Sequence, residues 1–391
     1  MNIPLKIAMV TGTRAEFGLL VPLIRAIERN NQCTLQLIVT GMHLEEKFGN
    51  TVQEIENEGI AIADKIPIRL TGDSEYDIIK STGIAMIGFA ESLKQLKPDW
   101  LVVLGDRFET FAAAISAHLA NIPVAHLHGG ELTEGATDDA MRHAITKMSF
   151  LHFTAAEAYK QRVIQMGESP KRVFNTGAIG IDNFKNPDFL SKKELEESLN
   201  IKLGKKIALV TFHPVTLEKG GAIAEMKEMI KALDRQKDWQ IIFTRPNADA
   251  GNQAINEVLE NFQKLNPLRV SVFTSLGQLR YLSLMKLSAA VIGNSSSGII
   301  EAPFCKVPSI NIGNRQKGRL MAPSVIQVSP KAKKIADAME LCSNHEFIKK
   351  INKQKPIFGK GNTAEKILKA ILKTGIPKQI VKSFHDLKPS H

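Results

Sequence analysis

The chain has 391 residues, 43% of them hydrophobic and 23% charged, which suits a folded protein of about two domains. No apolar run approaches the roughly 18–20 residues that span a membrane, and the N-terminus enters a strand without a signal peptide's apolar segment. The three cysteines are scattered, with no CxxC pair, and suggest neither a disulfide framework nor a zinc site. We therefore expect a cytoplasmic protein that contacts no membrane.

The formal net charge of +11 would also suit a nucleic-acid binder. However, the basic residues form no dense block interleaved with aromatic side chains, and aromatic residues make up only 6% of the chain. We expect an enzyme with an ordinary basic surface and no nucleic-acid partner. A phosphate-bearing substrate would suit the same charge.

The first half of the chain alternates short apolar runs with helical stretches. The expected strands are 6–11, 35–40, 60–66, 100–104, 122–125, 151–155 and 173–176. The expected helices are 19–29, a stretch near Glu54, 79–95, 111–120, 140–148 and 156–166. This alternation predicts an α/β fold with a doubly wound parallel sheet.

A stretch rich in Lys, Asn, Pro and Glu interrupts the alternation at residues 183–203, so we place a domain boundary near Asp182. A second α/β series follows, with strands expected at 206–211, 240–244, 270–273, 289–293, 309–312 and 326–328. We expect Rossmann-like domains at 1–181 and 182–370, then a C-terminal helix and basic tail at 371–391. The amphipathic helix beyond Thr363 could pack across both domains or cap the second.

Polar side chains cluster where two predicted strands end. Asp106 and Arg107 follow the strand at 100–104, His128 and Glu131 follow the strand at 122–125, and Asp138 comes shortly after. Residues past the carboxyl ends of such strands line the crevice where open α/β sheets bind ligands. Burying so many polar groups costs free energy, and a functional role would explain why they are present. We therefore expect acid–base chemistry here.

Three other turns have the composition of anion sites. Arg14 lies in a turn between a strand and a helix, where it could hold a phosphate or pair with Glu16 on the surface. Hydroxyl groups and glycine at 294–298 precede Glu301, and a Gly- and Arg-rich segment follows at 313–319. Backbone N–H groups in such turns can cradle a diphosphate.

Six motifs in this order resemble the UDP-N-acetylglucosamine 2-epimerase family: GTRAEFGLL, GDRFE, HLHGGE, DDAMRHAITKMS, HPVT, and GNSSSGIIE with GNRQKGR. The resemblance runs from about residue 5 to about residue 370 and is closest to the hydrolysing branch, which makes N-acetylmannosamine and UDP for sialic-acid synthesis. The GTRPE, HGDT and HVEAGLRT motifs of the non-hydrolysing branch are absent from this sequence. The family fold implies two Rossmann-like domains facing a cleft, as in GT-B glycosyltransferases.

The resemblance implies that UDP is eliminated across C1–C2 to give a glycal, which then adds water with the help of acids and bases. The implied catalytic residues are Asp106, Glu131, Asp138, His213 and His128. Animal bifunctional relatives carry a glutamate where this chain has His128. Either His128 does the proton transfer, or Glu131 takes it over, or the role differs in bacterial members. Arg107 is expected to position the hexose or the neighbouring acid.

The resemblance also implies a set of substrate-binding residues. They are Arg14, His43, Arg107, Ser295, Ser296, Glu301 and Arg315. In this set, Glu301 would accept from the ribose hydroxyls and His43 would contact the substrate. The resemblance implies no metal and no cofactor, a UDP-sugar as the partner, and a homodimer or homotetramer.

Structural explanations remain open beside the functional ones. Asp106 could cap the helix that follows it, and Asp139 suits the first turn of the next helix. We expect Glu109 to form an ion pair and His126 to bond inside the core. For the whole protein, the alternatives are the same reaction on a UDP-2,4-diacetamido-2,4,6-trideoxyhexose, a GT-B glycosyltransferase, or a non-catalytic UDP-sugar sensor.

Overall fold

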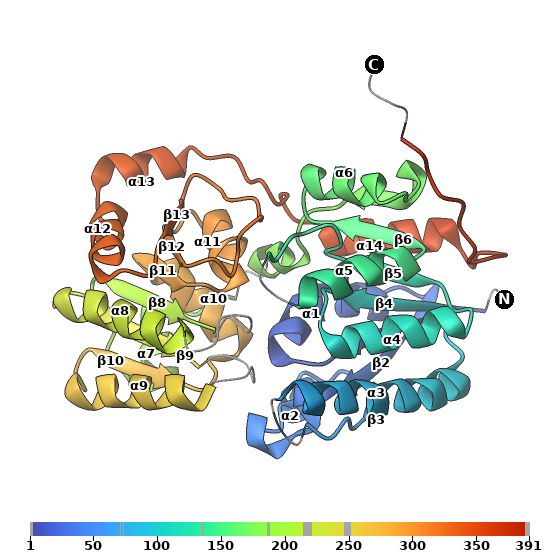
Figure 1. The fold of residues 1–391 in the computed structure, drawn as a ribbon, viewed down its shortest axis with the longest axis horizontal. Helices are drawn as coiled ribbons and strands as arrows, with labels where there is room; N and C mark the ends of the chain where they lie inside the picture. The colour runs from blue at the N-terminus through green and yellow to red at the C-terminus, as the bar shows by residue number, and fades with distance from the viewer. Residues whose placement is uncertain are drawn as a thin grey trace. The chain divides into compact units, whose positions relative to one another are not determined.

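The computed structural model describes residues 3–70, 72, 74–134, 137–185, 188–213, 221–245 and 252–387. The chain divides into two compact units, each built around a parallel sheet with helices (Figure 1). Unit 1 comprises Met1–Glu131, Asp138–Lys185 and Phe358–His391, and unit 2 comprises Leu132–Thr137 and Asn186–Ile357. The predicted fold class, α/β with two Rossmann-like sheets, is confirmed.

Unit 1 is a seven-stranded sheet in the order β3-β2-β1-β4-β5-β6-β7, and all its strand pairs are parallel. Its strands are β1 (Leu5–Thr11), β2 (Cys33–Thr40), β3 (Ile62–Ile66), β4 (Trp100–Leu104), β5 (Val124–Leu127), β6 (Leu151–Thr154) and β7 (Val173–Asn175). Its helices are α1 (Arg14–Glu28), α2 (Val52–Asn57), α3 (Glu75–Leu96), α4 (Phe108–Leu119), α5 (Asp138–Met148), α6 (Glu157–Gln165) and α14 (Thr363–Thr374). Short 3-10 turns are η1 (Gly41–Leu44), η2 (Glu46–Phe48), η3 (Pro170–Arg172) and η4 (Ile179–Lys185).

Both faces of this sheet are buried, because successive side chains of a strand point to opposite faces. In β1, Ile7 and Met9 belong to one hydrophobic core, and Ala8 and Val10 belong to another. The first core includes residues of α1 and α14, and the second includes residues of α3, α4 and α5. Continuous apolar strands are therefore what this two-sided burial requires.

Unit 2 is a six-stranded parallel sheet in the order β10-β9-β8-β11-β12-β13. Its strands are β8 (Ile207–Thr211), β9 (Gln240–Thr244), β10 (Val270–Phe273), β11 (Ala290–Gly293), β12 (Ser309–Ile312) and β13 (Val325–Val328). Its helices are α7 (Lys192–Leu199), α8 (Gly221–Arg235), α9 (Asn252–Leu265), α10 (Gly277–Leu287), α11 (Glu301–Phe304), α12 (Ala332–Cys342) and α13 (His345–Asn352), with a 3-10 turn η5 (Ser296–Gly298). The strand at 206–211 and its five successors thus lie within a residue or two of their predicted positions.

The C-terminal end of the second domain differs from the prediction. Residues 358–391 belong to unit 1, whereas we expected the second domain to continue to residue 370. The apolar face of α14, which includes Ile367, Leu368 and Ile371, belongs to the same hydrophobic core as residues of α1, and the two helices are in contact. An amphipathic helix specifies that one face will be buried, but it does not specify which core will bury it.

Helix α1 begins earlier than predicted, at Arg14 rather than residue 19. The hydroxyl of Thr13 accepts a hydrogen bond from the Glu16 N–H at 3.3 Å and caps the helix. The glycines around this turn suggested a longer loop, but Gly18 lies inside the helix. The cap places Arg14 in the first turn, beside the carboxyl end of β1.

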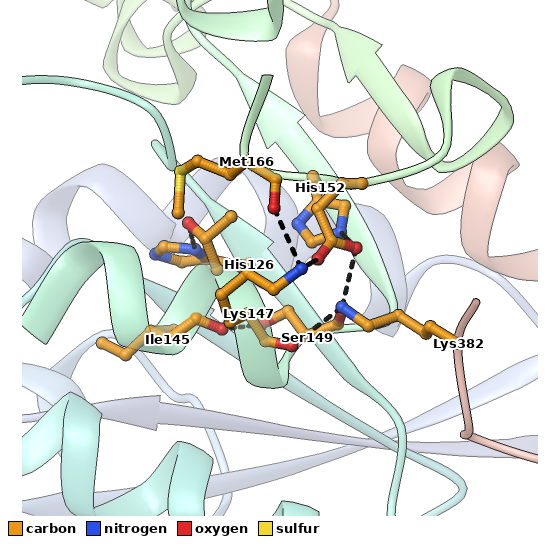
Figure 2. Close-up of polar contacts among 9 residues, drawn as sticks. His126, Ile145, Lys147, Ser149, His152, Met166 and Lys382 are labelled. Atoms are coloured by element: carbon orange, nitrogen blue, oxygen red, sulfur yellow. Dashed lines mark hydrogen bonds and ion pairs between the residues drawn. The ribbon is translucent and has the colours of Figure 1, made fainter. Parts of the chain in front are cut away.

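A buried ion cluster attaches the C-terminal tail to unit 1. The Glu168 side chain is 2% exposed and receives hydrogen bonds from Lys147 at 2.6 Å, Lys382 at 2.7 Å and His152 at 3.1 Å. The Lys382 ammonium also donates to the Lys147 carbonyl at 2.9 Å (Figure 2). Burial acts to raise the pKa of Glu168, but the three hydrogen bonds outweigh it and hold this pKa at about 2.

No helix in the described part of the chain is long and apolar enough to span a membrane.

Candidate active site

The strand order of unit 1 creates a switch point at which predicted site residues gather. Strands β2 and β3 lie to one side of β1, and β4 to β7 lie to the other, so the chain reverses direction across the sheet between β1 and β4. Arg14 follows β1, His43 follows β2, Asp106 follows β4, and His128 follows β5. Open α/β sheets bind ligands at the carboxyl edge beside such a reversal.

Asp106 forms an ion pair with Arg142, a residue that the sequence interpretation did not select. Nη2 of Arg142 donates to Oδ2 of Asp106, and Nη1 lies 3.8 Å from Oδ1 of Asp139. The Arg142 side chain is 3% exposed. Burial acts to lower the pKa of Arg142, but the charges of Asp106, Glu131, Asp139 and Asp138 outweigh it and raise this pKa. One guanidinium thus stands among four carboxyl groups, three of them predicted to be catalytic.

The backbone before Asp106 is fixed by a buried histidine. Nε2 of His126 lies 2.8 Å from the Gly105 carbonyl and Nδ1 lies 3.1 Å from the Thr146 hydroxyl. Burial lowers the pKa of His126 to about 3, so the ring is neutral. A carbonyl only accepts, so Nε2 carries the proton and the hydroxyl donates to Nδ1. His126 has the core role predicted for it, and it also holds the turn that carries Asp106.

The two alternatives for the third acid–base group, His128 and Glu131, contact each other. Nδ1 of His128 lies 2.8 Å from Oε1 of Glu131, and the two side chains are 11% and 4% exposed. The Ile179 N–H donates to Nε2 of His128 at 3.3 Å, so Nδ1 carries the proton. His128 has a φ of +65°, a left-handed conformation that is uncommon for a residue other than glycine. Both ring nitrogens are therefore engaged within the protein.

Arg107 pairs with Glu109 rather than with the neighbouring Asp106. Nε of Arg107 donates to Oε2 of Glu109, and Nη2 donates to Oε1, both at 3.2 Å. Glu109 is 1% exposed and lies in the first turn of α4. This agrees with the ion-pair role expected for Glu109.

His43 is fully buried and both its ring nitrogens have partners. Nε2 lies 3.1 Å from the Thr11 hydroxyl and Nδ1 lies 2.8 Å from the Thr51 hydroxyl. Burial lowers the pKa of His43 to about 4, so the ring is neutral at pH 7. The side chain ties the end of β1 to the start of α2, and substrate contact by His43 remains a prediction.

In unit 2, an asparagine joins the ends of the two strands at the switch point, β8 and β11. Oδ1 of Asn294 accepts from the His213 N–H at 2.7 Å, and Nδ2 of Asn294 donates to the His213 carbonyl at 2.8 Å. Nη1 of Arg315 donates to the Asn294 carbonyl at 3.1 Å, and Nε2 of Gln316 donates to the same oxygen at 2.7 Å. Asn294 is fully buried, and through these hydrogen bonds it connects the end of β8 with Arg315 and Gln316.

The segment that follows Asn294 turns more tightly than predicted. Ser295 caps the 3-10 turn η5, where its hydroxyl accepts from the Ser297 N–H at 3.4 Å. Ser296 is the first residue of η5, and Glu301 begins the four-residue helix α11. Ser297 contacts the Tyr281 hydroxyl at 2.5 Å. Of the predicted HPVT motif, residues 214–216 lie outside the described part of the chain.

Two central residues of these sites, Arg142 and Asn294, were missed as site residues by the sequence interpretation. Arg142 lies four residues after Asp138, so both occupy one face of α5, and this spacing was the available signal. Among the described residues, no group of three or more His, Cys, Asp or Glu side chains is placed to hold a metal ion.

Comparisons with known proteins identify relatives that match this chain over most of its length. The model of the family described as UDP-N-acetylglucosamine 2-epimerase matches residues 25–372. The GDP/UDP-N,N'-diacetylbacillosamine 2-epimerase (hydrolyzing) of Campylobacter jejuni subsp. jejuni serotype O:2 is 44% identical over 383 residues, which cover 98% of this chain and 99% of that protein. Polysialic acid biosynthesis protein P7 of Escherichia coli is 37% identical over 386 residues, with 98% and 97% covered. The solved structure of UDP-GlcNAc 2-epimerase from Neisseria meningitidis bound to UDP-GlcNAc has a TM-score of 0.80 at 21% identity, covering 94% of this chain and all of that one, which shows the shared fold.

Proposed function

Because the chain belongs to the UDP-N-acetylglucosamine 2-epimerase family, we propose that it hydrolyses a nucleotide-linked 2-acetamido sugar with inversion at C2. The family resemblance predicted from the motifs is confirmed by the match over residues 25–372. The observation that carries the proposal is the buried guanidinium of Arg142, which pairs with Asp106, lies 3.8 Å from Asp139, and has its pKa raised also by the charges of Glu131 and Asp138. A reaction with two proton transfers at carbon needs several acids and bases in one place.

The proposed reaction has two steps. In the first, a base removes the C2 proton, the C1=C2 double bond forms and the C1–O bond breaks, which releases UDP and leaves a glycal. In the second, water adds its hydroxyl to C1, and an acid returns a proton to C2 on the opposite face. We assign these proton transfers to Asp106, Glu131 and Asp138, with His213 as a further catalytic residue.

We assign the third acid–base role to Glu131 and an orienting role to His128. The contact of 2.8 Å between His128 Nδ1 and Glu131 Oε1 supports this division, because the imidazole ring lies against the carboxylate and can hold its orientation. The hydrogen bond from the Ile179 N–H to Nε2 of His128 also favours an orienting role for His128, because that nitrogen already accepts a hydrogen bond within the protein. This arrangement resembles the way a buried partner orients a catalytic group in other enzymes.

For the nucleotide, we assign the substrate-binding residues that the motifs predict. We propose that Ser295, Ser296 and Arg315 bind the diphosphate and that Glu301 accepts from the ribose hydroxyls. We propose that Arg14 and Arg107 contribute further cationic contacts to the substrate. The fixed backbone around Asn294 supports this assignment, because preorganised N–H groups bind phosphate without a cost of reordering.

For the sugar, we propose a 2,4-diacetamido-2,4,6-trideoxyhexose, with N-acetylglucosamine as the second candidate. The Campylobacter relative, named for N,N'-diacetylbacillosamine, is 44% identical and supports the first. The relative named for polysialic acid biosynthesis, 37% identical, supports the second, which was the leading prediction from the motifs. With UDP-N-acetylglucosamine as the substrate, the products would be UDP and N-acetylmannosamine, the precursor of sialic acids.

A substrate panel tests the proposal. The purified protein is incubated with UDP-N,N'-diacetylbacillosamine, its GDP analogue and UDP-N-acetylglucosamine, and nucleotide release is followed together with proton NMR of the sugar. We expect free nucleotide and a free 2-epimerised sugar in every productive reaction, with the highest kcat/KM for a diacetamido sugar. A stable nucleotide-linked epimer would contradict hydrolysis. Nucleotide release that requires an added acceptor would instead indicate a GT-B glycosyltransferase.

A further inference from the structure

Glu16 is a buried acid that holds the turn between β1 and α1. It is 8% exposed, and its Oε2 accepts from the Gly12 N–H at 2.7 Å. Its own N–H donates to the Thr13 hydroxyl at 3.3 Å. The turn before Arg14 is thus bonded to one glutamate, through the Gly12 N–H and the Thr13 hydroxyl.

A second buried acid, Glu109, lies against the same turn. A Cβ placed on Gly12 would lie 3.5 Å from Cδ of Glu109, and Glu109 is 1% exposed. Both of its oxygens already accept from Arg107, at 3.2 Å each. Two acids therefore share one turn, and the guanidinium beside them is bonded to Glu109 rather than to Glu16.

The surroundings of Glu16 favour an uncharged carboxyl group. Burial raises the pKa of Glu16 and Glu109 raises it further, whereas the Gly12 and Thr13 hydrogen bonds and the charge of Arg107 lower it, and the result is about 8. Among the residues that the structure describes, Oε1 of Glu16 has no hydrogen-bond partner. Burying a charged carboxylate with an unpaired oxygen costs much free energy. The protonated carboxylic acid carries no charge, so its burial costs less.

A negative charge at this turn would also oppose the role proposed for it. The start of α1 presents backbone N–H groups and the positive end of the helix dipole to an anion, and Arg14 is its first residue. A diphosphate brought to Arg14 would be repelled by a second carboxylate beside Gly12. An uncharged acid holds the same backbone without that repulsion.

We propose that Glu16 is a positioning residue that acts as an uncharged carboxylic acid and holds residues 12–14 ready for the diphosphate of the substrate. The inference rests on the proposed function, in which Arg14 contacts the nucleotide. Above the pH at which Glu16 loses its proton, the affinity for substrate falls while the acid–base groups around Arg142 are unaffected. The effect therefore appears in KM before it appears in kcat.

Three variants test this assignment. Glu16→Gln keeps an uncharged side chain with an acceptor and a donor, Glu16→Ala removes the hydrogen bond to Gly12, and Glu28→Gln is a matched control at the partly exposed end of the same helix. KM and kcat for the productive nucleotide sugar are measured from about pH 6 to about pH 9, where its diphosphate keeps a constant charge. Melting temperatures are recorded for each variant.

We expect the wild-type KM to rise by about tenfold between pH 7 and pH 9, as one carboxyl group loses its proton. Glu16→Gln should keep a KM within about twofold of wild type at pH 7 and lose the alkaline rise, and Glu16→Ala should raise KM by about tenfold or more. A flat wild-type KM, or a Glu16→Gln variant as impaired as Glu16→Ala but equally stable, would overturn the inference. If no sugar releases nucleotide, the proposed function fails, and Kd values of the same variants for UDP-N-acetylglucosamine, measured by calorimetry over the same pH range, decide the role of Glu16.

Discussion

The guanidinium of Arg142 donates to the carboxylate of Asp106, and this ion pair connects α5 to the turn after β4. The pair is almost fully buried on the arginine side, at 3% exposure. Because Arg142 also lies among the charges of Glu131, Asp138 and Asp139, its removal would leave several carboxyl groups facing one another. The ion pair therefore holds together the acids to which we assign the chemistry.

Replacement of Arg142 is expected to damage stability and turnover together. Arg142→Met leaves the partly exposed carboxylate of Asp106 without its cation, so the loss should not exceed the roughly 3–5 kcal/mol of a broken buried pair, and Arg142→Lys should recover part of it. Thermal unfolding and kcat measure the two effects. Arg235→Met, on an exposed part of α8, is the control and should match wild type. An Arg142→Met variant with unchanged melting temperature and turnover would contradict this role.

Asp106→Asn is expected to lower turnover by about 10²–10⁴-fold, the usual contribution of one acid–base group, while UDP still binds. The substitution keeps the size of the side chain and removes its charge. Single-turnover nucleotide release and calorimetric UDP binding separate the two effects. The exposed Asp238→Asn serves as the control. The helix-capping explanation for Asp106 is wrong, because the N-cap of α4 is Arg107 and no side chain caps that helix. Normal turnover in Asp106→Asn would therefore support a non-catalytic UDP-sugar sensor.

The division of roles between His128 and Glu131 predicts unequal effects. Glu131→Gln removes the proposed acid–base group and should lower kcat by about 10²–10⁴-fold. His128→Gln should lower kcat by a smaller factor, about tenfold, because it removes the ring that lies against the Glu131 carboxylate and orients it. The exposed His118→Gln is the control for the histidine substitution. A larger loss in His128→Gln than in Glu131→Gln would reverse the assignment.

Asn294→Ala is expected to weaken UDP binding by about tenfold or more, because both backbone groups of His213 lose their partners in a buried place. Asn294→Asp retains the acceptor and loses the donor, so it should be intermediate. Calorimetry with UDP measures both variants, and the exposed Asn57→Ala is the control. Unchanged UDP affinity in Asn294→Ala would place the nucleotide site elsewhere.

The Glu168 cluster makes unit 1 less stable in acid. The folded pKa of Glu168, about 2, lies below its unfolded value of about 4.3, so its contribution is present above that value and is lost as pH falls through the folded pKa. Burial also lowers the pKa of His152, so proton uptake on unfolding adds a loss in the same direction. Lys382→Met should lower the melting temperature at pH 7 and flatten its dependence on pH in the acid range. The exposed Lys378→Met is the control, and identical acid unfolding curves for the two variants would contradict the proposed anchor.

The parallel sheets could be predicted because buried strands read as continuous apolar runs, and the polar residues after them marked the carboxyl edges. Asp106 and Glu131 were selected in this way, because the local sequence alone places both residues after the ends of predicted strands. Arg142 could not be found so directly, because an arginine on a helix is most often exposed and only the packing of α5 buries it. The position of α14 could not be predicted either, because its amphipathic sequence does not specify which of the two domains buries its apolar face.

The partners of individual side chains were harder to predict than their positions. Arg107 stands beside Asp106 in the sequence, yet it pairs with Glu109, because adjacent residues at the start of a helix point in different directions. The same effect turned Glu16 away from Arg14 and toward Gly12. Adjacency in sequence therefore predicted a candidate site without predicting its ion pairs.

The central claim is that this protein releases UDP by elimination and then hydrates a glycal. The most direct measurement is proton NMR of the reaction with the preferred nucleotide sugar in deuterated water. We expect free nucleotide together with a free sugar of inverted C2 configuration that carries deuterium at C2, because the original proton leaves in the first step and solvent supplies its replacement. A free sugar that keeps both its original C2 proton and its C2 configuration would contradict the claim.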